Sequence, residues 1–322
     1  MFMTEITNEI QKAINALDDG KVIAIPTETV YGLAANIYNE NAINLIYKIK
    51  GRPNNNPLIV HIKSIEHLKE VATDIPPIAE KLAQHFWPGP LTLVLKKQKS
   101  ISNTISSGKD TVAVRVPNHS VVLNLLYNLE YPLAAPSANP FGSISPTNSN
   151  HVFQYFENKI DLILEGGNCV YGIESTIIGF ENNEAVLYRH GSIAIEEIKK
   201  ITGTLKIITK DNNAPNAPGM FSKHYAPKTK SFLVEDISHA IQSFGTEKIG
   251  VLLFQKKVAT SRPLKQYVLS DTGDFKEASK NLYAYLHELD SLELDVLLIE
   301  KLPNINLGKS INDRLIRAVA EI

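Results

Sequence analysis

The chain has 322 residues, of which 43% are hydrophobic and 21% charged, and its formal net charge is -1. This length accommodates two domains with their own cores, and the near-neutral charge excludes a global basic surface for nucleic acid. The chain has a single cysteine, Cys169, which excludes an intrachain disulfide and a thiolate metal site. We expect Cys169 to be a buried, unreactive residue rather than a nucleophile. Without a signal peptide or an apolar run of about 20 residues, a cytoplasmic protein with no membrane contact is expected.

The spacing of apolar residues predicts alternating helices and strands from the start of the chain. Helices are expected at 7–18, 42–49, 64–71, 76–87, 119–128, from 150, and at 195–201; strands at 21–25, 57–62, 91–95, 111–116, 132–135, 161–164, 175–179 and 185–189. A second α/β pattern has strands at 232–234, 249–254, 267–269 and 296–299 and helices at 237–244, 275–289 and 311–320. Between the two patterns, 210–218 is rich in Asn, Pro and Ala. We therefore predict an α/β protein with a first domain over 1–201, a linker over 202–230 and a second domain over 231–322.

The stretch 26–61 contains the first group of residues that could bind a ligand. Thr29 follows an apolar strand, Lys50 and Arg52 end a helical segment, and His61 closes the next strand. Open α/β sheets bind their ligands at the ends of the strands, and hydroxyls and cations at these positions can contact the ligand. An anion site and an ordinary β-α-β unit with solvated charges are both compatible with this pattern.

Other strand ends carry similar groups. Arg115 and Arg189 each end a strand, and Ser137 and Asn139 lie in a proline-flanked loop that suits phosphate contacts. No P-loop, G-x-G-x-x-G, G-x-S-x-G or H-E-x-x-H motif is present. Each group alone could be structural, and only their recurrence at strand ends points to an anionic ligand.

Ten segments carry a family resemblance. They are PTETVYGL (26–33), KIKGRP (48–53), NPLIVHI (56–62), FWPGPLTLVL (86–95), VAVRVPNH (112–119), PLAAPSANPFGSISPT (132–147), EGGNCVYGIESTI (165–177), LYRHGSI (187–193), PGMFSKHYAP (218–227) and INDRLIRAV (311–319). The sequence resembles the YrdC/YciO-like family, in particular its long, two-domain threonylcarbamoyl-AMP synthases. The resemblance implies an open, twisted, mixed sheet flanked by helices, followed by a smaller Rossmann-like α/β domain. One departure is Glu165, where the family typically has Asp before two glycines, and we expect little consequence.

The resemblance also implies a reaction. L-Threonine, bicarbonate and ATP would give L-threonylcarbamoyl-AMP, pyrophosphate and water, the first step of the N6-threonylcarbamoyladenosine modification of tRNA. Mg²⁺ would arrive with ATP rather than in a protein cage. A separate transferase complex would take the product to tRNA, with weak or no direct tRNA binding by this chain.

Site residues follow from the matching motif positions. Lys50 and Arg52 would be catalytic by neutralising phosphate charge. The positions expected to contact ATP are Lys50, Arg52, Asn56, Thr111, Ser137, Asn139, Ser145, Arg189 and, in a linker segment that covers the nucleotide, Tyr225. Those expected to contact L-threonine are Thr29, His61, Arg115, the backbone of Ala135, and Ser175. No residue stands out as a general base, and no protein metal site is expected.

Two other functions are compatible with parts of the sequence. YrdC-like folds are also associated with binding double-stranded RNA or tRNA; the neutral charge opposes this, and Lys50, Arg52 and the lysines of 96–99 weakly favour it. A carbamoyl-phosphate-processing relative would carry acylphosphatase and zinc-finger segments, which this sequence lacks.

Overall fold

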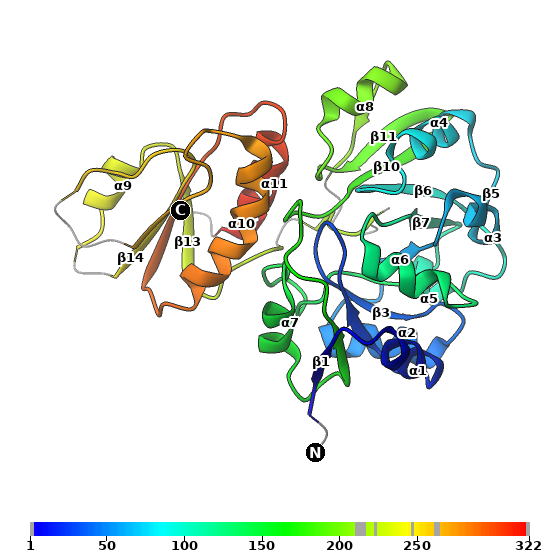
Figure 1. Cartoon of the computed structure of the whole chain (residues 1–322). Helices are drawn as coiled ribbons and strands as arrows, with labels where there is room; N and C mark the ends of the chain where they lie inside the picture. The colour runs from blue at the N-terminus through cyan, green and yellow to red at the C-terminus, as the bar shows by residue number, and fades with distance from the viewer. Residues whose placement is uncertain (1–2, 210–216, 222–223, 246–247, 261–264, 320–322) are drawn as a thin grey trace.

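The computed structural model describes residues 3–209, 217–221, 224–245, 248–260 and 265–319, and Figure 1 shows two α/β units side by side. Residues 210–216 and 222–223 of the predicted linker lie outside the described residues. No helix in the described parts of the chain is long and apolar enough to cross a membrane.

A large mixed sheet organises the first unit. Within the described residues it has twelve strands in the order β1-β9-β2-β3-β8-β4-β7-β6-β10-β11-β12, with β5 on β6. Their bounds are β1 Glu5–Thr7, β2 Ile23–Ile25, β3 Gly32–Asn36, β4 Ile59–His61, β5 Ala72–Thr73, β6 Leu91–Lys97, β7 Thr111–Arg115, β8 Leu133–Ala134, β9 Leu162–Leu164, β10 Thr176–Glu181, β11 Glu184–Arg189 and β12 Lys206–Ile207. The predicted mixed α/β sheet is confirmed.

Helices cover both faces of this sheet because successive strand residues point to opposite sides. The helices are α1 Ile10–Asp18, α2 Glu40–Lys50, α3 Leu68–Val71, α4 Pro77–Phe86, α5 Asn103–Ser106, α6 Ser120–Tyr127, α7 Ser149–Phe156 and α8 Ile195–Thr202, with a short 3₁₀ turn at Ile65–His67. Along β2, Ile23 and Ile25 join one core with α1 and α6, whereas Ala24 joins the other core with α2, α4 and α7.

The second unit is a small parallel sheet in the order β13-β16-β14-β15. Its elements are β13 Lys230–Val234, α9 Ile237–Gln242, β14 Ile249–Leu253, β15 Lys265–Val268, α10 Phe275–Asp290, β16 Val296–Glu300 and α11 Gly308–Ala318. α9 packs on one face of the sheet, and α10 and α11 share a core on the other face, toward the first unit (Figure 1). This agrees with the predicted Rossmann-like layer.

The two units are in close contact through α10 and α11. Val30, Ile144 and Ile173 of the first unit join the apolar core that α10 and α11 build. Gly172 lies so close to α10 that a Cβ there would be 2.4 Å from the Lys280 carbonyl oxygen. The C-terminal unit is therefore packed directly against the loops at the strand ends of the first.

Several elements differ from the predictions. The helix expected at 7–18 begins at Ile10, because residues 5–7 pair with β9 as strand β1. No strand was predicted over 32–36, yet β3 lies there between β2 and β8. The strand β12 at 206–207, within the predicted linker, pairs with β11. In each case pairing with a distant strand, rather than local pattern, decides the conformation.

Candidate active site

A tight turn after β2 places the first hydroxyls of the site. The Thr27 hydroxyl donates to the Val30 carbonyl at 2.6 Å and accepts from the backbone N–H of Thr29 at 3.1 Å. This side-chain–backbone bonding is how threonine stabilises a turn. The Thr29 side chain is buried and lines a cavity at the ends of β2, β4 and β7.

Strand register brings His61 and Arg115 together. β4 and β7 run parallel with His61 opposite Arg115, so both side chains leave the same face at the same strand end. Arg115 is 3% exposed, and its Nη1 donates to the Thr29 hydroxyl at 2.9 Å. Burial, together with Arg115, lowers the pKa of His61 to about 3, so its ring is neutral at physiological pH.

Glu28 is the buried counter-ion of Arg115 and was not predicted. Its Oε1 lies 2.5 Å from Nη2 of Arg115, and it is 2% exposed. Apart from this ion pair, neither carboxylate oxygen has a hydrogen-bond partner in the described part of the chain. A charged residue between two threonines in an otherwise buried turn is the sequence signal that could have identified it.

Lys50 and Arg52 are both buried and both hold neighbouring carbonyl groups. Lys50 Nζ donates to the carbonyls of Ser137 and Asn139, each at 2.5 Å. Arg52 donates to the carbonyl of Asn56 at 3.0 Å and to that of Pro57 at 2.7 Å. Burial lowers the pKa of Lys50 and brings that of Arg52 to about 10. The two predicted catalytic cations therefore also fix the loops that carry other predicted contacts.

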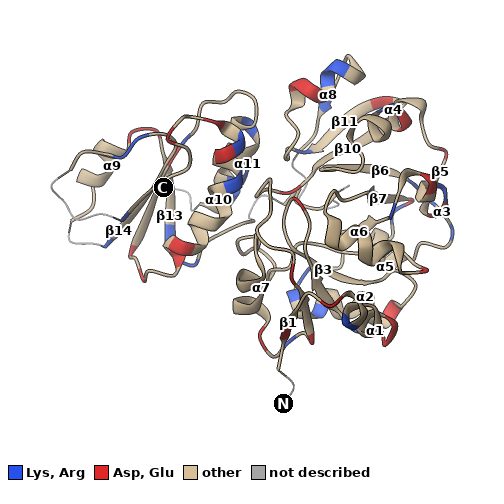
Figure 2. Ribbon diagram, in the orientation of Figure 1, with Lys and Arg blue, Asp and Glu red and all other residues tan. Residues whose placement is uncertain are grey.

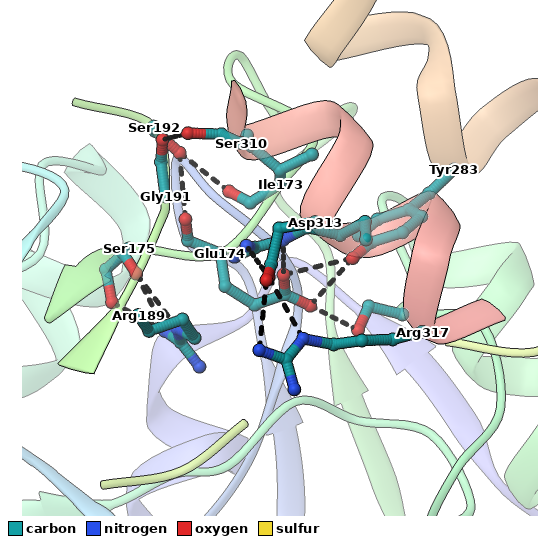
Figure 3. A network of polar contacts seen from close by, with 12 residues as sticks. Ile173, Glu174, Ser175, Arg189, Gly191, Ser192, Tyr283, Ser310, Asp313 and Arg317 are labelled. Atoms are coloured by element: carbon teal, nitrogen blue, oxygen red, sulfur yellow. Dashed lines mark hydrogen bonds and ion pairs between the residues drawn. The ribbon is translucent and has the colours of Figure 1, made fainter. Parts of the chain in front are cut away.

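On the other side of the cavity, β10 and β11 position Ser175 and Arg189. Arg189 Nη2 donates to the Ser175 hydroxyl at 3.0 Å and to its carbonyl at 2.9 Å. Glu174, the preceding residue, binds the C-terminal unit: its carboxylate accepts from the hydroxyl of Tyr283 at 3.0 Å and pairs with Arg314 at 3.3 Å (Figure 3). Glu174 also accepts from Ser145 at 2.6 Å.

The flap, defined here as the described linker residues 217–221 and 224–226, lies at one side of the cavity. Its described residues Pro218, Gly219, His224 and Tyr225 line the cavity, and Tyr225 is 1% exposed. The remaining cavity has a volume of about 50 Å³. A water needs roughly 10–15 Å³ of the same measure, so only a few waters fit. This space is smaller than a nucleotide.

The cavity gathers most of the predicted site residues. Nine of them line it: Thr29, Arg52, His61, Arg115, Ala135, Ser137, Ser175, Arg189 and Tyr225. Lys50, Asn56, Asn139 and Ser145 are buried in the surrounding loops but are not lining residues. Thr111 is not a lining residue; it begins β7, four residues before Arg115, which corresponds to roughly 13 Å along a strand. The role of each residue stays a prediction.

The electrostatics favour an anionic ligand. Three arginines, Arg52, Arg115 and Arg189, line the cavity, and Glu174 is the one carboxylate among its described lining residues. That carboxylate is already bound to Arg314, Tyr283 and Ser145. Guanidinium groups match carboxylate and phosphate oxygens with two parallel hydrogen bonds. The cations and small hydroxyls that line the cavity are therefore suited to bind carboxylate and phosphate groups.

Arg314 and Arg317 of α11 were also missed. Both are 1% exposed and stand three residues apart, on the face that also carries Ile311 and Leu315. Arginines at helical spacing among buried apolar positions are a signal that could have identified them.

Comparison with known proteins identifies the family. A family model described as telomere recombination (Sua5_yciO_yrdC) matches residues 15–191, and one described as threonylcarbamoyl-AMP synthase, C-terminal domain, matches 193–320. Threonylcarbamoyl-AMP synthase of Pyrococcus abyssi is 41% identical, over 96% of this chain and 94% of that protein. The Bacillus subtilis enzyme of the same name is 36% identical, over 96% and 92%.

Solved structures agree. The crystal structure of P. abyssi Sua5 complexed with L-threonine superposes with a TM-score of 0.89 at 37% identity and covers 99% of both chains. E. coli YciO, at 23% identity and a TM-score of 0.51 over 59% of this chain, shares the fold. The chain belongs to the threonylcarbamoyl-AMP synthase family.

Proposed function

We propose that this chain makes L-threonylcarbamoyl-AMP from L-threonine, bicarbonate and ATP, releasing pyrophosphate and water. The observation that carries the proposal is the cavity itself. Arg52 from the loop after α2, Arg115 at the end of β7 and Arg189 at the end of β11 line it together, in a family member of matching length. Figure 2 shows acidic and basic residues interspersed over both units, which favours a local anion site over an RNA-binding face.

The chemistry has two steps. The threonine amine combines with bicarbonate, forming a C–N bond with loss of water. An oxygen of the resulting carbamate then attacks the α-phosphorus of ATP, and the bond from that phosphorus to the bridging oxygen of pyrophosphate breaks. Positioning and charge neutralisation supply most of the catalysis in such a displacement.

In this proposal Arg115 holds the threonine carboxylate, because its guanidinium is buried, oriented by Glu28 and adjacent to Thr29. Neutral His61 lines the cavity beside Arg115, and the Ser175 hydroxyl lines its other side, next to Arg189. The N–H of Ala135 already donates to Ile59, so a ligand would meet its carbonyl oxygen.

The nucleotide would occupy the end that carries Arg52, Arg189 and the loop of Ser137. Lys50 holds that loop in place by donating to two of its carbonyls. Asn56, Asn139 and Ser145 are buried in the surrounding loops without lining the cavity. Thr111 does not line the cavity either, so its predicted contact would require ATP to extend beyond it. Glu174, the one carboxylate among the described lining residues, is engaged with Tyr283 and Arg314, so in this proposal Mg²⁺ comes bound to the ATP phosphates. A separate transferase system would consume the product, and the cytoplasmic location stays a prediction.

Pyrophosphate release tests the proposal. Purified protein with ATP and bicarbonate should release pyrophosphate with L-threonine, and mass spectrometry should detect the adenylate; equal release with serine, glycine or no amino acid would refute the threonine assignment. Arg52→Gln should lower turnover by roughly 10²–10³-fold, the usual cost of one charge-stabilising donor. Lys48→Gln, an exposed cation on the same segment, is the matched control. Turnover of the Arg52 variant near that of the control would refute the phosphate role.

A further inference from the structure

Two hydroxyl groups that line the cavity, those of Thr29 and Ser175, each contact one arginine and one further threonine hydroxyl. A hydroxyl has one proton to donate and two lone pairs that accept, and its proton rotates to suit the neighbours. An arginine can only donate. The threonine partner therefore decides whether the proton of each cavity hydroxyl is free for a ligand.

The proton of the Thr29 hydroxyl is held by Thr27. Oγ1 of Thr27 lies 2.6 Å from the Val30 carbonyl oxygen, which can only accept, so the one proton of Thr27 is used there. The same Oγ1 accepts from the backbone N–H of Val30 at 3.2 Å and lies 2.9 Å from Oγ1 of Thr29. This last bond therefore needs the proton of Thr29. Since Thr29 also accepts from Nη1 of Arg115 at 2.9 Å, its one remaining lone pair can only accept from a ligand.

The Ser175 hydroxyl has the opposite arrangement. Its Oγ accepts from Nη2 of Arg189 at 3.0 Å and lies 2.7 Å from Oγ1 of Thr92 (Figure 3 shows Arg189 against Ser175). Thr92 is fully buried in β6, and Ser175 is the one partner of its hydroxyl in the described part of the chain. If Ser175 donated this bond, the Thr92 proton would be buried without an acceptor, which is costly. Thr92 therefore donates, and the proton of Ser175 is free to point into the cavity.

We propose that Thr27 and Thr92 are positioning residues that set the direction of hydrogen bonding at the cavity, with Thr29 as a fixed acceptor and Ser175 as a fixed donor. Thr92 is not among the described lining residues, so it acts only through Ser175. A ligand must present an N–H or O–H group to Thr29 and an oxygen lone pair to Ser175.

This polarity fits an α-amino acid, a consequence that rests on the proposed function. Thr29 is bonded to Arg115, the residue proposed to hold the carboxylate of threonine. An α-amino acid carries its N–H groups on the carbon next to its carboxylate, so the fixed acceptor lies where the amine would be. Ser175, beside Arg189, would donate to an oxygen atom of the same substrate.

Neutron diffraction from crystals of the unmodified full chain in D₂O tests the polarity without any substrate. The deuterium of Thr92 should point at Ser175, the deuterium of Thr29 should point at Thr27, and the deuterium of Ser175 should point into the cavity. A deuterium of Ser175 that points at Thr92, or one of Thr27 that points at Thr29, would overturn the proposal. This measurement needs no variant, so it decides the polarity even if a variant fails to fold.

Variants of Thr92 test its effect on the ligand. Thr92→Val keeps the shape of the side chain and removes the donor, so L-threonine should bind roughly 3- to 10-fold more weakly in calorimetric titration, the usual worth of one neutral hydrogen bond. Thr92→Ser keeps the hydroxyl and should bind like the unmodified chain. Thr4→Val is the matched control, because Thr4 is also buried and donates to the Ile160 carbonyl at 2.6 Å but does not line the cavity. Unchanged affinity in Thr92→Val, or an equal loss in the control, would overturn the positioning role.

A double-variant cycle separates positioning from a general loss of packing. Ser175→Ala removes the group through which Thr92 acts, so adding Thr92→Val to it should weaken threonine binding no further. Losses that multiply in the double variant would overturn the proposal. Failure of the unmodified chain to bind threonine would count against the proposed function, whereas the neutron result would stand.

Discussion

The buried pair of Glu28 and Arg115 allows stability and ligand binding to be separated. Arg115 has its counter-ion at 2.5 Å, and the two residues are 3% and 2% exposed. Changing either residue alone to Met leaves the other as a buried charge without its partner. Changing both removes the two charges together and substitutes apolar side chains, a replacement that proteins often tolerate.

The expected magnitudes follow from burial. Each single change, Glu28→Met or Arg115→Met, should lower the free energy of unfolding by about 3–5 kcal/mol. At about 2–4 °C per kcal/mol for domains of this size, the melting temperature should fall by roughly 10 °C. The double variant should recover most of that loss. L-Threonine affinity should behave differently, because the double variant still lacks the Arg115 guanidinium.

Denaturant unfolding and calorimetric titration with L-threonine measure the two quantities. The control is the same pair of changes at Glu235 and Lys301, an ion pair at 2.8 Å whose side chains are 81% and 41% exposed. Its coupling energy should stay below about 1 kcal/mol. A double variant no more stable than the weaker single variant would refute the charge argument, and Arg115→Met with unchanged threonine affinity would refute the site assignment.

Three further predictions concern acid stability, the flap and the cysteine. Burial lowers the pKa of His61 and His151 to about 3 and that of His287 to about 4, with Arg115 adding to the effect at His61 and His287 at His151. Below about pH 6.5 these histidines are therefore protonated in the unfolded chain but not in the folded chain. The free energy of unfolding should fall as pH drops from about 6.5 toward 4, by up to roughly 1.4 kcal/mol per histidine per pH unit. A urea midpoint equal at pH 7 and pH 5 would contradict this. Gly219→Ala should open the flap and accelerate its amide exchange, because Gly219 has a φ of +86° and a Cβ there would lie 2.8 Å from Cδ of Arg189. Unchanged exchange at the flap would count against this prediction. Burial raises the pKa of the Cys169 thiol, so a thiol reagent should label it in urea and not in the native chain, and rapid native labelling would disprove this.

Sequence patterns predicted a large part of the site because several of its residues end strands. His61, Arg115 and Arg189 each follow an apolar run. Because such a run marks a buried strand, the polar residue that ends the run also marks the end of the strand. The register of β4 and β7 then places His61 beside Arg115 without further specification. The linker position of Tyr225 was also visible in the sequence, but only the resemblance suggested that it covers the nucleotide.

Other features depended on contacts between distant residues. The strand β3 has the sequence GLAAN, a composition with little strand preference, and it is extended because β2 and β8 bond to it on either side. Thr111 matched a motif position, yet β7 carries it to the far end of the strand from Arg115. Strand pairing and strand length set both outcomes, and neither is encoded within a short window.

The sequence by itself determined the alternation of helices and strands, the division into two α/β patterns and the cations at the strand ends. These follow from residue spacing and from the preference of charged groups for the ends of buried elements. Only the tertiary structure decided that Glu28 neutralises Arg115 and that α11 contacts both the cavity wall and the flap. Those contacts join residues up to 140 positions apart, and long-range packing rather than local propensity selects such partners.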